Sequence, residues 1–257
     1  MQKFILIFLL CLVSNISTAG SNQATESKFT AEEVKVFAKN VEKYAAKHGA
    51  RAFIIARVGQ PKDKLPKGIE FTHTAIAVYS EITLNDGRKV KGYAIHNLYQ
   101  DAKDGDVSSL VVDYPVDFFW GVHELKAGII IPTPALQNKI IEVIASGKSE
   151  LLHNPRYSLV ANPFNNEYQN CTEHTLNIIN SAIYQTTNMK QLKANAKAYF
   201  EPQTVKVSRF KLALGSMFAE GIRTKDHKGK IRTTSFGAIA DYLLKYQLAS
   251  SKQIFTI

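Results

Sequence analysis

The sequence predicts an α+β protein in which an antiparallel sheet packs against a helix that starts with a cysteine. Two runs of β-forming residues, at 71–79 and 89–99, are separated by the Asn85-Asp86-Gly87 turn, and this pattern is typical of a β-hairpin. Polar residues flank Cys171, and an apolar run with helical spacing follows at 176–183, which indicates a helix whose first turn holds the cysteine. Extra helices are expected near both ends of the chain.

The first 19 residues have the pattern of a secretory signal peptide. Lys3 supplies a positive charge, residues 4–13 form an apolar run, and Ser17-Thr18-Ala19 ends the segment with small residues. The apolar run is short for a membrane span. We therefore expect a signal peptide at 1–19 and a periplasmic or secreted protein, with an uncleaved N-terminal anchor as the alternative.

The other elements follow from capping residues, turn residues and periodicity. Residues 20–50 form an N-terminal segment and a helix, because Thr30 and Glu33 make a capping box and Gly49 ends the apolar spacing. In a core at 51–200 we predict strands at 51–58, 71–79, 89–99, 126–131 and 157–161, a packed aromatic turn or short helix at 118–120, and helices at 134–146, 171–184 and 189–199. In a C-terminal extension at 201–257 we predict an extended segment at 204–207, an apolar segment at 211–218 and a last helix at 236–248.

The formal net charge of +10 favours anionic partners such as a cell-envelope surface. The basic residues are spread along the chain, and the densest segment, 223–232, contains glycine and polar residues without interleaved aromatic residues. We therefore interpret it as a solvated loop and expect no nucleic-acid partner. No spacing of cysteine and histidine typical of a metal site occurs, and no cofactor is expected.

Cys171 is the single cysteine left once a signal peptide containing Cys11 is removed. One thiol in an exported chain cannot form an internal disulfide, so Cys171 is a buried structural residue, an intermolecular crosslink or a reactive group. The start of a helix favours the reactive group, because unpaired backbone N–H groups and the helix dipole stabilise a thiolate and can bind an oxyanion.

A nucleophilic cysteine needs a base within hydrogen-bond reach, and a third group usually orients that base. Of the seven histidines, His73 opens a predicted strand after a loop, where it can face the start of a helix. His174 lies on the cysteine helix itself and points back along it, which disfavours it as the base. His96 and Asn97 lie on the neighbouring strand and face opposite sides, so only one of them can join His73.

Three segments carry a resemblance to a known superfamily. They are Thr72-His73-Thr74-Ala75-Ile76-Ala77-Val78-Tyr79, Tyr93-Ala94-Ile95-His96-Asn97-Leu98 and the distant Asn170-Cys171-Thr172-Glu173. Their order resembles the circularly permuted branch of the NlpC-type papain-like superfamily, whose neighbourhood includes lecithin retinol acyltransferase-like proteins. The mature chain also resembles an exported bacterial family known as a domain of unknown function. The superfamily resemblance covers about residues 51–184.

The resemblance implies a papain-like fold with a thiolate nucleophile at Cys171 and with His73 as general base and then acid. It also implies a residue on the adjacent strand that orients the imidazole. The superfamily accepts His, Asn or Gln there, so His96 and Asn97 both qualify. We choose Asn97, because it continues the face that holds Tyr93 and Ile95. The Cys171 backbone N–H would hold the oxyanion with a second donor, for which Tyr157, Tyr168 and Gln169 are candidates.

These residues predict an exported cysteine hydrolase or acyltransferase that acts on an amide or ester of the cell envelope. Peptidoglycan stem-peptide amides fit the compartment, and lipid esters fit the permuted branch and the apolar segment at 211–218. The alternative is a non-catalytic envelope-binding or accessory protein that uses a papain-like scaffold and its basic surface to hold a glycan, a lipid or a secreted partner.

Overall fold

The computed structural model describes residues 26–84, 86–206 and 221–256. The predicted signal peptide at 1–19 and the apolar segment at 211–218 lie outside these residues. Helix α1 (Ala31–Lys47) begins as predicted. The Thr30 hydroxyl accepts a hydrogen bond from the Glu33 N–H, and the Glu33 carboxylate accepts one from the Thr30 N–H. Within the described part of the chain, no helix is long and apolar enough to span a membrane.

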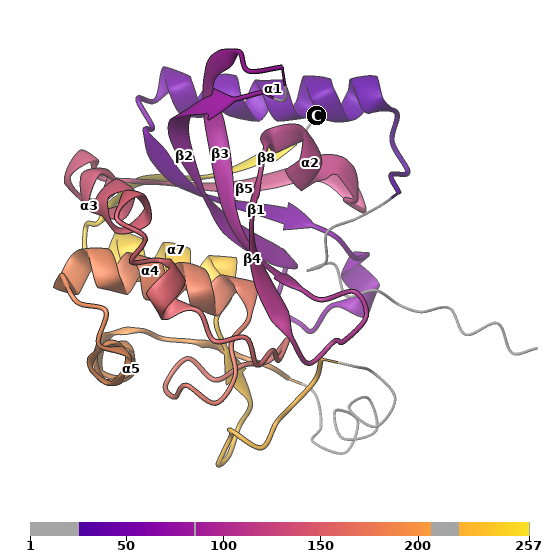
Figure 1. Cartoon of the computed structure of the whole chain (residues 1–257). Coiled ribbons are helices and arrows are strands. Elements are labelled where there is room, and N and C mark those ends of the chain that lie inside the picture. The colour runs from indigo at the N-terminus through magenta and orange to yellow at the C-terminus, as the bar shows by residue number, and fades with distance from the viewer. Residues whose placement is uncertain (1–25, 85, 207–220, 257) are drawn as a thin grey trace, which may run out of the picture.

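The centre of the fold is a six-stranded antiparallel sheet with the strand order β4-β3-β2-β1-β5-β8 (Figure 1). The strands are β1 (Ala52–Val58), β2 (His73–Thr83), β3 (Lys89–Gln100), β4 (Ser108–Asp113), β5 (Glu124–Pro132) and β8 (Ala249–Thr256). Strands β2 and β3 form the predicted hairpin, with Thr83 opposite Lys89. The sheet and its helices confirm the α+β class.

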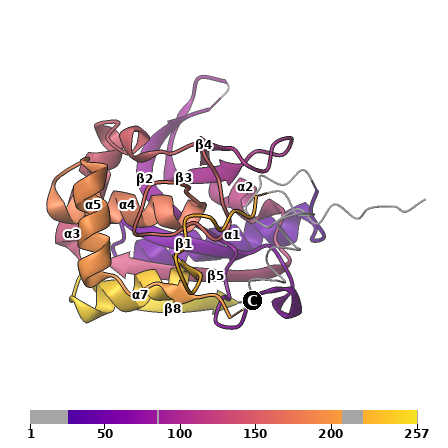
Figure 2. The same cartoon turned by 90° about the horizontal axis from the view of Figure 1, so that it is seen from below.

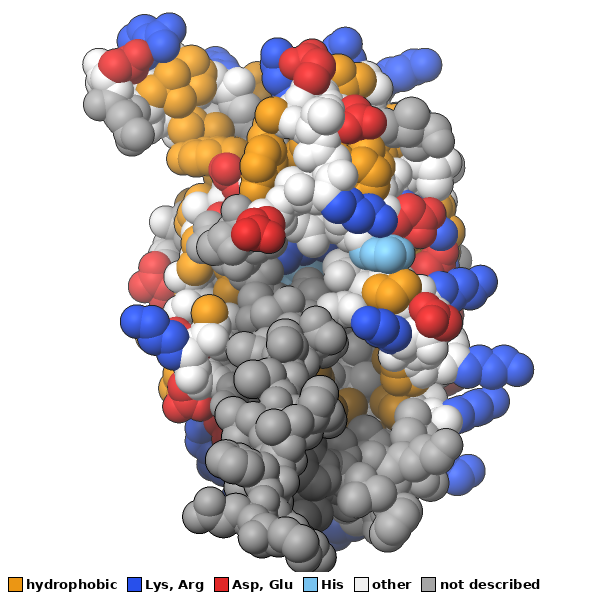
Figure 3. Space-filling model, turned by 90° about the vertical axis from the view of Figure 1, so that its right-hand side faces the viewer, with side chains coloured by type: hydrophobic (Ala, Val, Ile, Leu, Met, Phe, Trp, Pro, Cys, Tyr) orange, Lys and Arg blue, Asp and Glu red, His pale blue; other side chains and the backbone are white. Residues whose placement is uncertain are grey.

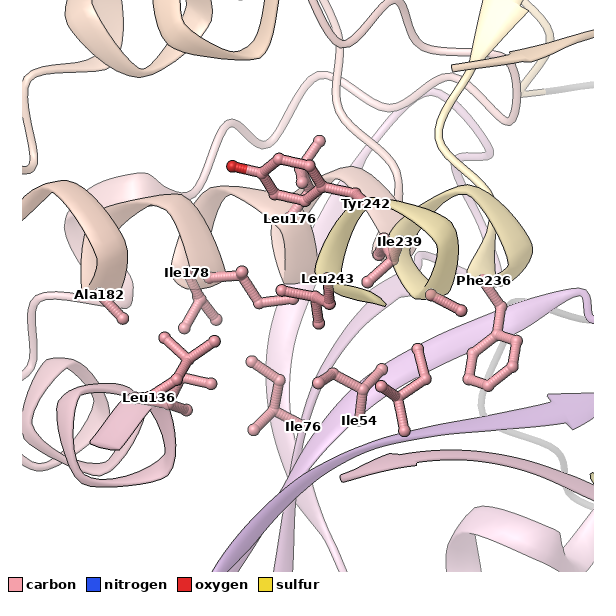
Figure 4. Close-up of a cluster of buried hydrophobic side chains, with 14 of the residues drawn as sticks. Ile54, Ile76, Leu136, Leu176, Ile178, Ala182, Phe236, Ile239, Tyr242 and Leu243 are labelled. Atoms are coloured by element: carbon pink, nitrogen blue, oxygen red, sulfur yellow. The ribbon is translucent and has the colours of Figure 1, made fainter. Parts of the chain in front are cut away.

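Helices cover both faces of the sheet (Figures 1 and 2). One face packs against α1 and the short helix α2 (Pro115–Trp120), which contains the predicted aromatic cluster. The other face packs against α3 (Pro134–Ala145), α4 (Cys171–Tyr184) and α7 (Phe236–Lys245), and α5 (Met189–Tyr199) packs on α4. Figure 4 shows the apolar core between α4, α7 and the sheet. Because both faces of β1 are covered, all seven of its residues are buried.

Two edge strands are missing from the predicted set. Strand β4 begins with two serines and lies at one edge of the sheet, and β8 lies at the other edge with mostly polar, partly exposed residues. Edge strands carry a weak alternating pattern, since only one side of the strand is hydrogen-bonded and much of it faces water. The strand predicted at 157–161 is not formed. Only a single bridge joins Tyr157 to Gln169 there.

The segment at 221–233 lies against the loop that leads into α4. The Leu159 N–H donates to the Gly221 carbonyl at 2.8 Å, and His227 Nε2 is 2.8 Å from the Val160 carbonyl oxygen. Asp226 and His227 are buried, so the interpretation of 223–232 as a solvated loop is wrong for its centre. The Asp226 carboxylate accepts a hydrogen bond from the Asn162 N–H at 2.9 Å, and this bond offsets part of the cost of burying the carboxylate.

The remaining elements are short. They are the 3₁₀ turns η1 (Lys62–Lys64) and η2 (Glu150–Leu152) and a two-stranded ladder of β6 (Gln203–Thr204) with β7 (Arg232–Thr233). The ladder includes the start of the predicted extended segment at 204–207, whose last residue is outside the described residues.

Candidate active site

The first pair of the candidate site is His73 with Asn97. His73 Nε2 lies 2.9 Å from Asn97 Oδ1, and Asn97 Nδ2 donates to the Ile95 carbonyl at 3.0 Å. Because the Asn97 amide nitrogen is already used as a donor, its oxygen accepts from Nε2–H. A neutral His73 in this tautomer has its free lone pair at Nδ1, and Nδ1 has no hydrogen-bond partner within the described structure.

His96 lies on the opposite face of the sheet from Asn97. It belongs to a group of buried or half-buried histidines with His153 and His174, in which the rings of His153 and His174 are 6.1 Å apart and edge-on. Burial lowers the pKa of His174 to about 3, and this ring donates to the Leu152 carbonyl. The structure therefore brings Asn97, and not His96 or His174, to His73.

Cys171 is the first residue of α4, as predicted. Asn170 is the N-cap, and its side-chain oxygen accepts from the Glu173 N–H at 2.9 Å. The Cys171 thiol interacts with the backbone N–H of Thr74, the residue after His73, and Sγ is 3.7 Å from the Thr172 hydroxyl oxygen. The first turn of α4 thus lies directly against the strand that carries His73.

A gap in the sheet makes this contact available. Pairing between β2 and β3 begins only at Ile76 and His96, so Thr74 has no partner residue on β3. Helix α4 takes the place of β3 there, because the Thr175 hydroxyl also donates to the Thr74 carbonyl, at 3.3 Å. Thr74 and Thr175, 101 positions apart in the sequence, are therefore in contact where the β2–β3 pairing ends.

Both proposed reacting groups are buried, Cys171 at 3% exposure and His73 at 0%. Burial raises the pKa of the Cys171 thiol, although the hydrogen bond from Thr74 and the charge of Arg57 act in the opposite direction. Burial, with the nearby Arg57 charge, holds the pKa of His73 well below its usual range. The pair is thus a neutral thiol and a neutral imidazole near pH 7. This differs from the thiolate expected at a helix start, because desolvation outweighs the helix dipole.

Three groups around His73 did not stand out in the sequence. Tyr99 stacks on the imidazole with ring centroids 4.8 Å apart and planes at 9°, and its hydroxyl donates to Asp113 at 2.5 Å. Arg57 is the register partner of His73 on β1 and is almost fully buried. A single cation inside an otherwise apolar strand was the available signal for Arg57.

The candidate oxyanion donors are placed differently from one another. The Gln169 amide is used inside the fold, since it donates to the Leu152 carbonyl and accepts from the Asn154 N–H. The Tyr168 ring lies beneath the cations of Arg156 and Lys225. Tyr157 packs in one buried cluster with Cys171 and Leu98.

No group of three or more histidine, cysteine or acidic side chains in the described ranges could hold a metal ion. A hollow of about 900 Å³ lies beside the start of α1, and Phe29, His123 and Thr256 are among the residues that line it. It does not include Cys171, His73 or Asn97.

Comparison with known proteins gives one informative result. Neither the curated proteins nor the solved structures contain a significant match to the chain. A family model does match, over residues 44–243, a range that contains His73, Asn97 and Cys171 and most of the sheet. The chain therefore belongs to the bacterial family described as "Uncharacterized protein conserved in bacteria (DUF2145)".

Proposed function

We propose that this protein is a cysteine hydrolase or acyltransferase with a papain-like, permuted NlpC-type arrangement of its active residues. The observation that carries the proposal is the His73–Asn97 hydrogen bond, which leaves Nδ1 free on the residue next to the Thr74 backbone that Cys171 contacts. The proposal assigns the nucleophile to α4, the base to β2 and the group that orients the base to β3.

The reaction follows from a neutral starting pair. Cys171 Sγ attacks the carbonyl carbon of an amide or ester while His73 Nδ1 takes the thiol proton, and Asn97 holds Nε2–H. The tetrahedral oxyanion collapses, His73 gives its proton to the leaving amine or alcohol, and a thioester remains on Cys171. Water or another acceptor then attacks the thioester, and its proton returns through His73 to the cysteine sulfur.

Burial of the pair adds a requirement to this scheme. A substrate carbonyl reaches Cys171 only when the side chains packed around the thiol, such as Leu98 and Tyr157, move aside, because the thiol is 3% exposed. Opening also hydrates the thiol and relieves the burial that raises its pKa. The enzyme proposal therefore includes a conformational step before acyl transfer.

We further propose that the protein is exported and acts in the cell envelope. The pattern of residues 1–19 supports export, and peptidoglycan stem-peptide amides and lipid esters are the substrate classes that fit this compartment. An anionic envelope surface fits the net charge of +10. Basic side chains are spread over the face in Figure 3 with acidic ones between them, so attraction to such a surface would be diffuse.

An acyl-enzyme experiment tests the catalytic proposal. The protein is mixed with p-nitrophenyl acetate, and both a burst of nitrophenolate and an acetyl adduct on the Cys171 peptide are measured. We expect one adduct per chain, none in Cys171→Ala, and a rate lower by about 10²–10⁴-fold in His73→Ala. Asn97→Ala should slow acylation, whereas His96→Ala, on the same strand but the other face, should not. Equal, small effects of the two would remove the orienting role from this strand.

The burial itself favours a second candidate function, a non-catalytic envelope-binding or accessory protein on the same scaffold. In that case Cys171 is a packing residue of the cluster that holds Leu98 and Tyr157. The same experiment separates the two functions. A thiol that becomes acylated or alkylated only after denaturation, at a rate that does not depend on His73, supports the binding protein.

A further inference from the structure

Arg57 is a buried charged residue that has no role in the reaction proposed for Cys171, His73 and Asn97. It is 2% exposed and is one of the largest fully buried side chains in the described structure. Burying a guanidinium costs several kcal/mol unless its surroundings compensate. The groups around this cation, on the central strand β1, therefore decide how its burial is compensated.

The position of Arg57 is set by the sheet register. Arg57 faces His73 across the β1–β2 ladder, and both side chains project to the face covered by α2. The Arg57 guanidinium donates to the Phe118 carbonyl on α2. Its position is thus fixed by strand register at one end and by a helix carbonyl at the other.

Arg57 and His73 share the same two aromatic rings. The guanidinium carbon lies 5.4 Å from the centroid of Tyr99 and 5.1 Å from that of Phe118, within the range of cation–π contacts. The His73 ring stacks on Tyr99 at 4.8 Å and tilts against Phe118 at 5.6 Å. An imidazolium at this place would put a second positive charge beside the first, in a buried site.

Other charged or titratable groups surround the pair. Asp113 on β4 accepts the Tyr99 hydroxyl, and both Arg57 and Asp117 act on its carboxylate, while burial raises its pKa. The Cys171 thiol on α4 also feels the Arg57 charge. Burial opposes protonation of the imidazole most and lowers its pKa, and the Arg57 charge acts in the same direction, while the Asp113 carboxylate interacts with that charge.

We propose that Arg57 is a positioning residue for the proposed cysteine chemistry, one that keeps the His73 imidazole neutral and fixed between Tyr99 and Phe118 so that Nδ1 can accept the thiol proton. The catalytic role of Arg57 rests on the proposed function, but its effect on the protonation of His73 does not depend on turnover. Replacing the charge should change the protonation of His73 whether or not acyl transfer occurs.

The test compares Arg57→Met with Arg57→Lys and with Arg51→Gln, which removes an exposed cation directly before the same strand. Methionine is chosen because replacing a buried charge with an apolar side chain is often neutral for folding. His73 protonation is followed by NMR of the ring nitrogens against pH, and the acid limb of acetyl-enzyme formation is measured in parallel.

In Arg57→Met the His73 midpoint should rise by at least one pH unit, a tenfold gain in proton affinity, and the acid limb should move with it. Arg57→Lys should keep the wild-type profile, and Arg51→Gln should change neither readout. If Arg57→Met does not fold, Arg57→Met with Asp113→Asn removes the counter-charge as well, and Asp113→Asn alone is its reference.

The outcomes separate the two proposals. An unchanged His73 midpoint in a folded Arg57 variant that still forms the acyl-enzyme overturns the role of Arg57 and leaves the enzyme proposal in place. A raised His73 midpoint in Arg57→Met, together with a wild-type protein that never acylates Cys171, supports the electrostatic role of Arg57 and contradicts the enzyme proposal.

Discussion

Replacing His174 should make the protein markedly less sensitive to acid. This buried ring belongs to α4, and burial lowers its pKa to about 3, with the neighbouring His153 adding to the effect. An unfolded histidine titrates near 6.5. Below that pH the unfolded chain binds a proton at this histidine and the folded chain does not. The contribution of neutral His174 to the free energy of unfolding is therefore present above pH 6.5 and is lost as the pH falls toward 3.

The size of this loss follows from the two pKa values. At pH 5 the solution is about 1.5 pH units below the pKa of the histidine in the unfolded chain. At about 1.4 kcal/mol per unit, the free energy of unfolding is therefore lower by about 2 kcal/mol than at pH 7.5. The other buried histidines add to the loss in the same direction. Glu173 acts in the opposite direction, because burial raises its pKa to about 7, but it is present in both chains and cancels from the comparison.

The assay is urea unfolding at pH 7.5 and pH 5, followed by the fluorescence of the single tryptophan, Trp120 in α2. His174→Gln should lose about 2 kcal/mol less than the wild type between the two pH values. The exposed His48→Gln is the matched control and should behave as the wild type. An acid-induced loss of equal size in His174→Gln and the wild type would refute the reasoning, whatever the absolute stability of the variant.

Two further substitutions test how the cysteine helix and the sheet are held. Lys193→Met leaves the fully buried Glu173 carboxylate without its ammonium partner and should cost about 3–5 kcal/mol in urea unfolding at pH 8, most of which Glu173→Gln recovers in the double variant. Gly128→Ala places a methyl group 2.6 Å from Phe236 Cζ and should lower the free energy of unfolding by about 1–3 kcal/mol. Phe236→Leu in the same chain should relieve the clash, and a purely additive double variant would contradict this.

Sequence patterns predicted the parts of the fold that carry strong local signals. The capping box at Thr30, the hairpin turn near Gly87 and the polar cap before Cys171 each determine a boundary through a few neighbouring residues. The strands β4 and β8 were missed, because an edge strand is specified by its partner strand more than by its own residues.

The same limit applies to the candidate site. The order of His73, Asn97 and Cys171 was readable, and alternation along β3 was enough to separate Asn97 from His96. Burial could not be predicted from the sequence, because it depends on α2 at His73 and on Leu98 and Tyr157 at Cys171, which come from other parts of the chain. The thiolate expected at Cys171 is therefore replaced by a thiol whose pKa burial raises. The position of Arg57 opposite His73 followed only from the β1–β2 register.

The opening of the ladder at Thr74 connects the fold to the proposed chemistry. A fully paired β2–β3 ladder would satisfy the Thr74 backbone with β3 and leave no place for the first turn of α4. The β2–β3 pairing ends at Ile76 and His96, although β3 stays paired with β4 as far as Gln100. The helix bonds to Thr74 instead, and the sulfur comes to lie beside the strand that holds His73. Contact between the start of α4 and the strand that carries His73 thus depends on where the β2–β3 ladder ends. A change that extended this pairing by two residue pairs, to Thr74 opposite Leu98, would displace Cys171 without touching its side chain.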